Sequence, residues 1–154
     1  MKKIIYSPGE PSGIGPDLII KLSSSKLWEN LKIPIVSIGD PKLFIDRAAL
    51  LKKKIKIVEL KSPNEVNKNT KGLIQIIKVT KCPNTRPGKL SKSNAQYVLD
   101  NLTYSIKQTM QNEGTALVTG PLSKENIISI DKLFTGHTEY IKKITKSKDV
   151  LMML

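Results

Sequence analysis

The only histidine of the chain, His137, lies between a glycine and a threonine in residues 135–139. Residues 118–124 form a second candidate loop, in which a short apolar strand runs into a Gly-Pro turn followed by Ser and Lys124. A helix that starts at His137 and Thr138 would offer free backbone N–H groups, which attract anions. An imidazole, hydroxyls and a lysine near such a helix start predict a site for a small phosphorylated or carboxylated molecule.

The glycine of that turn, Gly120, lets the backbone approach a ligand closely. A third loop, residues 7–16, carries three glycines between a predicted strand and a helix that starts at Pro16. Its order, G-x-x-x-G-x-G with prolines inside, differs from the dinucleotide fingerprint G-x-G-x-x-G. Asp40, which could pose as the ribose-binding acid of that fingerprint, is better explained as a helix cap before a proline. We therefore interpret this loop as a rigid turn suited to a ligand, with Gly13 as a possible contact.

Other groups that could do chemistry are isolated in the sequence. Cys82 is the single cysteine and has no histidine near it, so we interpret it as a bystander thiol. One histidine cannot make a zinc site, and no second His or Cys stands at ligand spacing, so no metal site is expected in this chain. A lone cysteine excludes an internal disulfide and fits a reducing cytoplasm.

The net charge of +13 over 154 residues raises the question of nucleic acid or an anionic membrane as a partner. Only Arg47 and Arg86 are arginines, the residue that usually reads bases and phosphates, and the lysines are scattered without stacking aromatics between them. No apolar run approaches the ~20 residues that span a bilayer, and the start of the chain does not read as a secretory signal. We therefore expect a cytoplasmic protein that binds neither nucleic acid nor membrane.

Apolar periodicity predicts alternating strands and helices, and hence an α/β sandwich with a largely parallel sheet. Strands are predicted at residues 3–6, 34–39, 55–58, 73–79, 116–118 and 150–154, and helices from Pro16, from Pro41 and at 91–112, 123–130 and 137–146. The last strand is wholly apolar and nothing follows it that could cover it, whereas both faces of a parallel sheet are covered. We therefore expect a chain cut within a domain.

Three segments together resemble one known family. Residues 9–16, Gly-Glu-Pro-Ser-Gly-Ile-Gly-Pro, resemble the N-terminal loop of the 4-hydroxythreonine-4-phosphate dehydrogenases, enzymes of pyridoxal phosphate biosynthesis. Residues 119–124 resemble that family's strand-end loop, and residues 134–139, with Met-Met-Leu at 152–154 after them, match a third signature in order and spacing. Residues 46–49 and 88–91 also fall where the family has similar residues.

The resemblance implies that residues 1–154 are the N-terminal part of a two-domain α/β dehydrogenase. The implied fold is a three-layer sandwich akin to isocitrate and isopropylmalate dehydrogenases, incomplete at its C-terminus. The implied reaction oxidises the secondary alcohol of 4-phosphohydroxy-L-threonine with NAD or NADP, after which the β-keto acid loses CO₂ and leaves an aminoketone phosphate. In the family, His137 and Thr138 correspond to substrate-binding positions, and the sites form at a homodimer interface.

The family also uses a divalent metal, Zn, Mg or Co, which polarises the alcohol oxygen. Its three histidine ligands come later in the family's sequence, and family members are roughly twice as long as this chain. We therefore expect the 154-residue chain alone to be inactive. The alternatives are a sister dehydrogenase acting on another four-carbon phosphorylated hydroxy acid, such as threonate or erythronate phosphate, and a non-catalytic, truncated phosphate-binding remnant. A basic nucleic-acid binder would instead show steeply salt-dependent binding.

Overall fold

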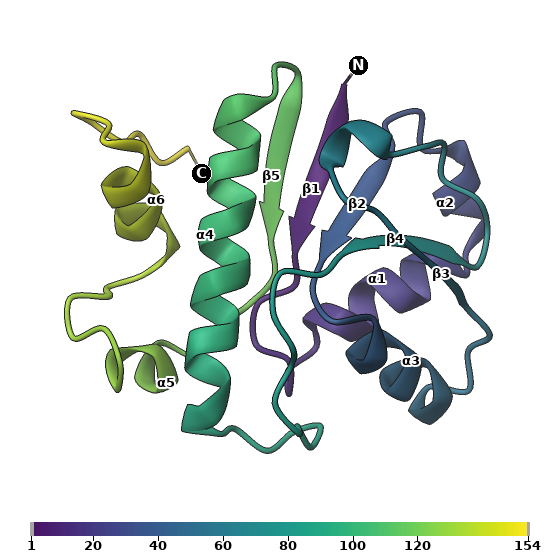
Figure 1. Cartoon of the computed structure of the whole chain (residues 1–154), viewed down its shortest axis with the longest axis horizontal. Helices are drawn as coiled ribbons and strands as arrows, with labels where there is room; N and C mark the ends of the chain where they lie inside the picture. Colours follow the sequence, from purple (N-terminus) through teal and green to yellow (C-terminus); the bar gives the residue numbers. More distant parts are fainter. Residues whose placement is uncertain (1, 154) are drawn as a thin grey trace.

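A computed structural model describes residues 2–153 as five strands that alternate with helices (Figure 1). The strands are β1 (Lys3–Ser7), β2 (Ile35–Ile38), β3 (Lys56–Glu59), β4 (Leu73–Ile77) and β5 (Thr115–Thr119). The helices are α1 (Gly15–Ser23), α2 (Lys26–Asn30), α3 (Pro41–Leu50), α4 (Ala95–Gln111), α5 (Lys124–Ile128) and α6 (His137–Thr145), with two short 3₁₀ turns, η1 (Pro63–Glu65) and η2 (Lys92–Asn94).

The five strands form one parallel sheet in the order β3-β4-β2-β1-β5. Isoleucines fill both of its faces, and Ile5, Ile38 and Ile76 are fully buried, as expected of parallel strands covered on two sides. The predicted parallel α/β architecture is thus confirmed. Because β1 and β5 are neighbours with Ser7 opposite Thr119, the loops that follow these two strands emerge side by side.

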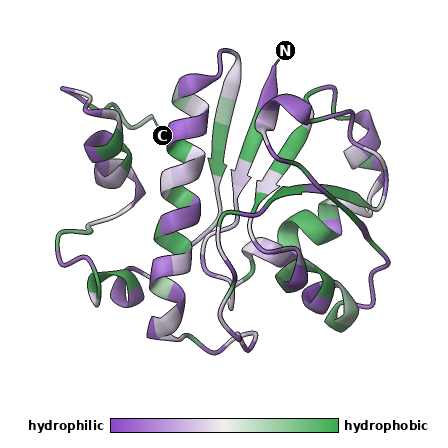
Figure 2. Ribbon diagram, viewed as in Figure 1, coloured by the Kyte–Doolittle hydropathy of each residue, from purple (hydrophilic) through white to green (hydrophobic). Residues whose placement is uncertain are grey.

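Helices lie on both faces of the sheet and make the outer two of three layers. Helix α1 packs against β4 and α3, and its buried Ile19 and Ile20 belong to the main core. Helix α4 crosses the opposite face over β1 and β5, burying Val98, Leu102 and Ile106 at the predicted helical spacing (Figure 2). Within residues 2–153, no helix has both the length and the apolar composition required to cross a bilayer.

Strand β5 is an edge strand, and among residues 2–153 no helix covers one of its faces. Val118 is 45% exposed on the face that α1 covers farther along the sheet. A shallow apolar groove of about 180 Å³ runs there between β5 and α1, lined by Ile4, Tyr6, Leu18, Ile19, Leu22, Ile35 and Val118. The sheet therefore presents a bare apolar strip beside its open edge.

Two features differ from the sequence prediction. Helix α2 was not predicted, because five residues carry too little periodicity to be recognised, yet it places Trp28 at 1% exposure in the core. The predicted strand at residues 150–154 is wrong for 150–153, which pair with no strand of the described part and leave Leu151 and Met153 more than 90% exposed. A strand needs a hydrogen-bonded neighbour, and apolar composition alone does not provide one. Leu154 lies outside the described residues.

Candidate functional site

The loops after β1 and β5 interlock at the carboxyl edge of the sheet. The Glu10 amide donates to the Pro121 carbonyl at 2.9 Å, and the Gly120 amide donates to the Ser7 carbonyl at 2.7 Å. The contact is so close that a Cβ on Gly9 would lie 2.2 Å from the Pro121 oxygen. The two predicted loops are therefore one rigid unit.

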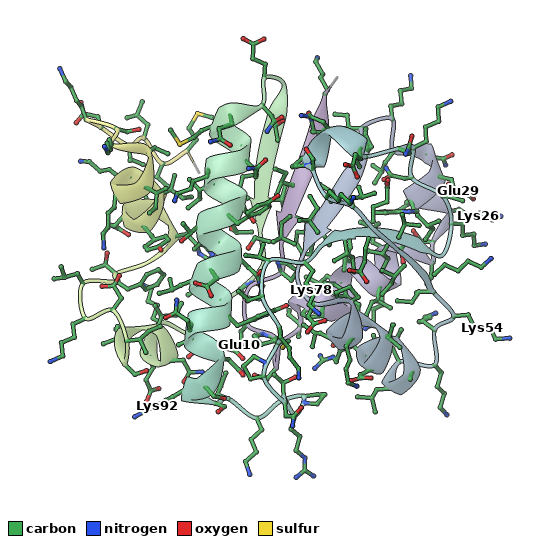
Figure 3. All side chains as sticks on the ribbon, in the orientation of Figure 1. Glu10, Lys26, Glu29, Lys54, Lys78 and Lys92 are labelled. Carbon is green, nitrogen blue, oxygen red and sulfur yellow. The ribbon has the colours of Figure 1, made fainter. Side chains whose placement is uncertain are left out.

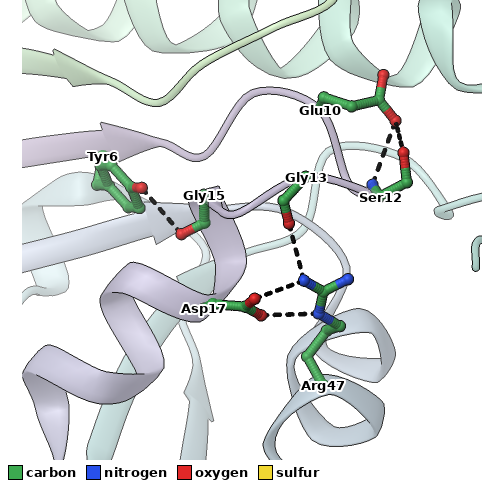
Figure 4. Close-up of polar contacts among 7 residues, drawn as sticks. All are labelled: Tyr6, Glu10, Ser12, Gly13, Gly15, Asp17 and Arg47. Carbon is green, nitrogen blue, oxygen red and sulfur yellow. Dashed lines mark hydrogen bonds and ion pairs between the residues drawn. The ribbon is translucent and has the colours of Figure 1, made fainter. Parts of the chain in front are cut away.

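The glycines of these loops are required by contacts within the chain. A Cβ on Gly15 would lie 1.8 Å from the Pro8 oxygen, and one on Gly120 would lie 2.2 Å from the same atom. The Gly13 carbonyl accepts a hydrogen bond from Arg47 Nη2 at 2.8 Å, and the same guanidinium pairs with Asp17 (Figure 4). Gly13 and Gly120, predicted as possible ligand contacts, thus have a packing role in the structure, and ligand binding by them stays a prediction.

Glu10 is a site residue that the sequence did not reveal. Its side chain is only 4% exposed, and no lysine or arginine within residues 2–153 pairs with it. Its Oε1 accepts from Ser12 N at 3.2 Å and from Ser12 Oγ at 2.7 Å (Figure 4). The same oxygen accepts from Asn94 Nδ2 at 2.5 Å, and Oε2 accepts from Asn126 Nδ2 at 3.5 Å. The one feature of the sequence that indicated its burial is that this glutamate lies among glycines and prolines and not among other charged residues.

His137 is the first residue of α6 and is half-buried. The helix is held against α4 by Tyr140, whose Oη lies 2.7 Å from Thr103 Oγ1, and by the buried ring of Phe134 stacked at a tilt on Tyr140. Thr138 follows in the first turn and is also half-buried. The imidazole therefore lies at the helix end where backbone N–H groups are unpaired.

Lys124, the first residue of α5, reaches the same helix end. Its Nζ lies 3.7 Å from the point where a Cβ on Gly136 would stand, directly before His137, and the carboxylate oxygen Oε2 of Glu139 lies 3.4 Å from the same point. Burial lowers the pKa of His137, and the nearby Lys124 charge lowers it further. The structure thus brings together a neutral imidazole, an ammonium group and a helix N-terminus, which suits a phosphate or carboxylate. Whether His137 and Thr138 bind substrate stays a prediction.

We expect Lys124→Met to raise the pKa of His137 toward its ordinary value, because the substitution removes the positive charge that opposes protonation of the imidazole. The pH titration of the imidazole NMR signals measures this directly, since the chain has one histidine. Lys132→Met, a substitution at an exposed lysine elsewhere on the chain, is the control and should leave the titration unchanged. An unaltered His137 pKa in Lys124→Met would show that the two groups are not coupled.

A separate cavity of about 350 Å³ lies between α3 and the loop at residues 81–87. Asp40 lies in its wall and caps α3 by accepting from Lys42 N at 3.2 Å, which confirms the predicted helix cap. Burial raises the pKa of the Cys82 thiol to about 12, and the charges of Asp40 and Glu10 contribute to the rise. The thiol is therefore protonated at neutral pH, as a bystander would be.

Neither a metal site nor a basic stripe is evident among the described residues. Nowhere in residues 2–153 do three His, Cys, Asp or Glu side chains converge as a metal site would require, so the residues present do not fit a metal by themselves. In Figure 3, Lys26, Lys54 and Lys92 lie at separate places around the molecule, whereas Lys78 lies over its centre and pairs with the buried Asp40 at 3.4 Å. The candidate anion site of the described residues is the Lys124 and His137 pair with its supporting loops, and ligand binding there stays a prediction.

Comparison with known proteins decides the family. The family model for the pyridoxal phosphate biosynthetic protein PdxA matches residues 30–154. The chain belongs to the PdxA family. A 4-hydroxythreonine-4-phosphate dehydrogenase of Citrobacter koseri is 34% identical over 154 residues, covering 100% of this chain and 46% of that protein. One of Methylococcus capsulatus is 35% identical over 151 residues, covering 98% of this chain and 44% of that protein. The predicted family is therefore confirmed, and the chain spans less than half the length of these PdxA relatives.

Solved structures agree on the fold. A 4-hydroxythreonine-4-phosphate dehydrogenase from Burkholderia phymatum superposes with a TM-score of 0.85 at 20% identity, covering 97% of this chain and 45% of that one. One from Klebsiella pneumoniae gives 0.84 at 24% identity, with 97% and 46% covered. The predicted fold, akin to that of isocitrate dehydrogenase, is confirmed for this part of a PdxA structure.

Proposed function

We propose that residues 1–154 are the N-terminal half of a two-domain 4-hydroxythreonine-4-phosphate dehydrogenase and supply part of its substrate site. The observation that carries the proposal is the meeting of Lys124 and His137 at the start of α6. These residues come from two separate segments that resemble PdxA signatures, and the fold places them together. An ammonium group beside a helix N-terminus is suited to an anionic four-carbon substrate.

In this proposal, the ammonium of Lys124 pairs with the phosphate or carboxylate of the substrate. The neutral imidazole of His137 donates one N–H to the same molecule, and the Thr138 hydroxyl donates another hydrogen bond. The reaction moves a hydride from the substrate carbinol carbon to NAD or NADP and releases the hydroxyl proton. The resulting β-keto acid then loses CO₂ to give the aminoketone phosphate. This chain contributes binding and orientation of the substrate.

The remainder of the protein is the expected source of the other groups. Since residues 2–153 do not fit a metal by themselves, a Zn, Mg or Co ion would require ligands from outside this chain. The bare apolar strip beside β5 is a surface that such a remainder would cover. We further propose a homodimer in the cytoplasm, acting on a small phosphorylated substrate, with neither nucleic acid nor membrane as a partner.

The activity assay tests the proposal. We expect the purified 154-residue chain, given 4-phosphohydroxy-L-threonine, NAD or NADP and Zn²⁺, Mg²⁺ or Co²⁺, to form no NAD(P)H. The reading frame that follows codon 154 should encode a half with three well-spaced histidines, and co-expression of both halves should restore turnover. In the completed enzyme, Lys124→Met should raise KM for the phosphorylated substrate, because it removes a binding charge.

Three results would contradict this function. Turnover by the chain alone would refute the need for a second half. A completed protein that ignores 4-phosphohydroxy-L-threonine but oxidises threonate or erythronate phosphate would make it a sister dehydrogenase. A downstream sequence without such histidines would leave a phosphate-binding remnant.

A further inference from the structure

We propose that Glu10 is the positioning residue of the substrate site: its buried carboxylate fixes α5, through Asn126, so that Lys124 stands beside His137. The importance of this role for catalysis rests on the proposed function. The positioning itself is argued only from the contacts of Glu10. Within residues 2–153, Glu10 makes no hydrogen bond or ion pair with Lys124 or His137. It acts through the segments that it joins.

The partners of Glu10 come from three separate parts of the chain. Ser12 belongs to the loop after β1, Asn94 ends η2 directly before α4, and Asn126 lies in α5. The backbone amide of Glu10 also holds the Pro121 carbonyl at 2.9 Å, in the loop that leads to α5. One residue thus binds the segment carrying Lys124 on both sides, at Pro121 and at Asn126.

Helix α5 depends on such external contacts. It has five residues, which is too short for a helix to be stable by itself. Its Asn126 is 6% exposed and donates to Glu10 Oε2 at 3.5 Å and to the Ser91 carbonyl at 3.1 Å. Its first turn is capped by Ser123, whose Oγ accepts from Asn126 N at 3.3 Å. Asn126 therefore ties Lys124, two residues earlier, to the Glu10 carboxylate.

The buried Glu10 carboxylate, which has no cationic partner among residues 2–153, contributes little to the stability of the fold. Desolvation of the charge opposes folding, and well-packed apolar groups commonly serve stability equally well. Hydrogen bonds to a charged acceptor are, however, directional, so they hold several segments in one arrangement. Those from Ser12 Oγ and Asn94 are short and strong, whereas the one from Asn126 is long and weaker. The hydrogen bonds around Glu10 are thus suited to fixing the geometry of the loops. They act most on the long side chain of Lys124, because its position depends on where α5 begins.

The test uses the whole 154-residue chain with its single histidine as the reporter. The imidazole NMR signals of His137 are titrated with pH, and then with inorganic phosphate at fixed pH, in wild type, Glu10→Ala and Glu10→Gln. The control is Asn69→Ala, which removes another buried side chain with three hydrogen bonds, to Ile35 N and the Leu31 and Ile33 carbonyls, away from the site. Urea unfolding of each variant reports its stability.

We expect Glu10→Ala to raise the pKa of His137 and to weaken phosphate binding by about tenfold, because Lys124 loses its fixed position. Glu10→Gln keeps one acceptor oxygen and should restore part of both properties, which also keeps the test valid if Glu10→Ala fails to fold. In a Lys124→Met background, the same Glu10 substitution should shift the His137 pKa less, since Glu10 acts through Lys124. Asn69→Ala should lower stability and leave both His137 readouts unchanged.

The positioning role is overturned if the folded Glu10 variants keep the wild-type His137 pKa and phosphate affinity, or if Asn69→Ala shifts them equally. A wild-type chain whose His137 ignores phosphate would count against the proposed substrate site instead. The comparison of His137 pKa values needs no ligand, so it would still decide the role of Glu10.

Discussion

Alanine at position 9 should remove much of the stability of this protein. Gly9 has a φ of +78°, and a Cβ added there would lie 2.2 Å from the Pro121 oxygen. The left-handed backbone costs a non-glycine residue about 1–2 kcal/mol, and forcing apart two backbone segments adds about 1–3 kcal/mol. We therefore expect Gly9→Ala to lower the free energy of unfolding by about 2–5 kcal/mol. The fluorescence of Trp28, the single tryptophan, follows the urea transition from inside the core.

Gly88 provides a matched control for this substitution. Its φ is +75°, nearly that of Gly9, but nothing lies within 4 Å of where its Cβ would stand. Gly88→Ala should therefore cost only the backbone contribution, about 1–2 kcal/mol. The difference between the two variants measures the contact between the loops after β1 and β5. Equal losses would show that these loops do not interlock as described.

Arg47→Ala should produce the second large loss of stability. The side chain is 7% exposed, donates to both carboxylate oxygens of Asp17 at 2.7 Å, and also donates to the Gly13 carbonyl (Figure 4). Removing one partner of a buried pair costs about 3–5 kcal/mol, because the remaining charge stays buried and unpaired. Asp17 is 18% exposed, so some water reaches it and we expect the lower end of that range. Urea unfolding measures the loss.

The exposed pair of Lys42 and Asp46 is the control for Arg47. Its N–O distance is also 2.7 Å, but the side chains are 72% and 56% exposed. Lys42→Ala should change the free energy of unfolding by no more than about 0.5 kcal/mol, since exposed ion pairs contribute little. A second variant, Arg47→Met with Asp17→Leu, removes both charges and should recover most of the stability lost in Arg47→Ala. A loss in the double variant as large as in Arg47→Ala would show that the unpaired charge is not its cause.

The elements that the sequence predicted are those with long apolar periodicity or a clear cap. Helix α4 follows from apolar residues at helical spacing, and α3 follows from Asp40 before Pro41. The single histidine and Lys124 were also recognisable, because residue type and position near a helix start are local properties. Helix α2 was missed since its five residues are held by the burial of Trp28, which is a tertiary contact.

Glu10 shows why the rest of the site was not predictable. Its role depends on Asn94 and Asn126, which are distant in the chain and meet it only after the sheet has formed. The loop glycines illustrate the same point. Their number indicated a backbone open to a ligand, whereas Gly15 and Gly120 are required by the nearby Pro8 carbonyl. Sequence patterns report local geometry, and these contacts are long-range.

The sheet order has a consequence for how the molecule folds. Strand β3 pairs with β4 at Lys56 and Leu73, a short loop to close, whereas β1 pairs with β5 at Lys3 and Thr115, across most of the chain. Closing the longer loop costs more chain entropy, and contacts of high sequence separation slow folding. Strands β1 and β2 pair at Ile4 and Ile35, also a short separation, so we expect β1 to β4 to become ordered before β5 joins the edge of the sheet. The Lys124 and His137 site, which follows β5 in the chain, would be completed last.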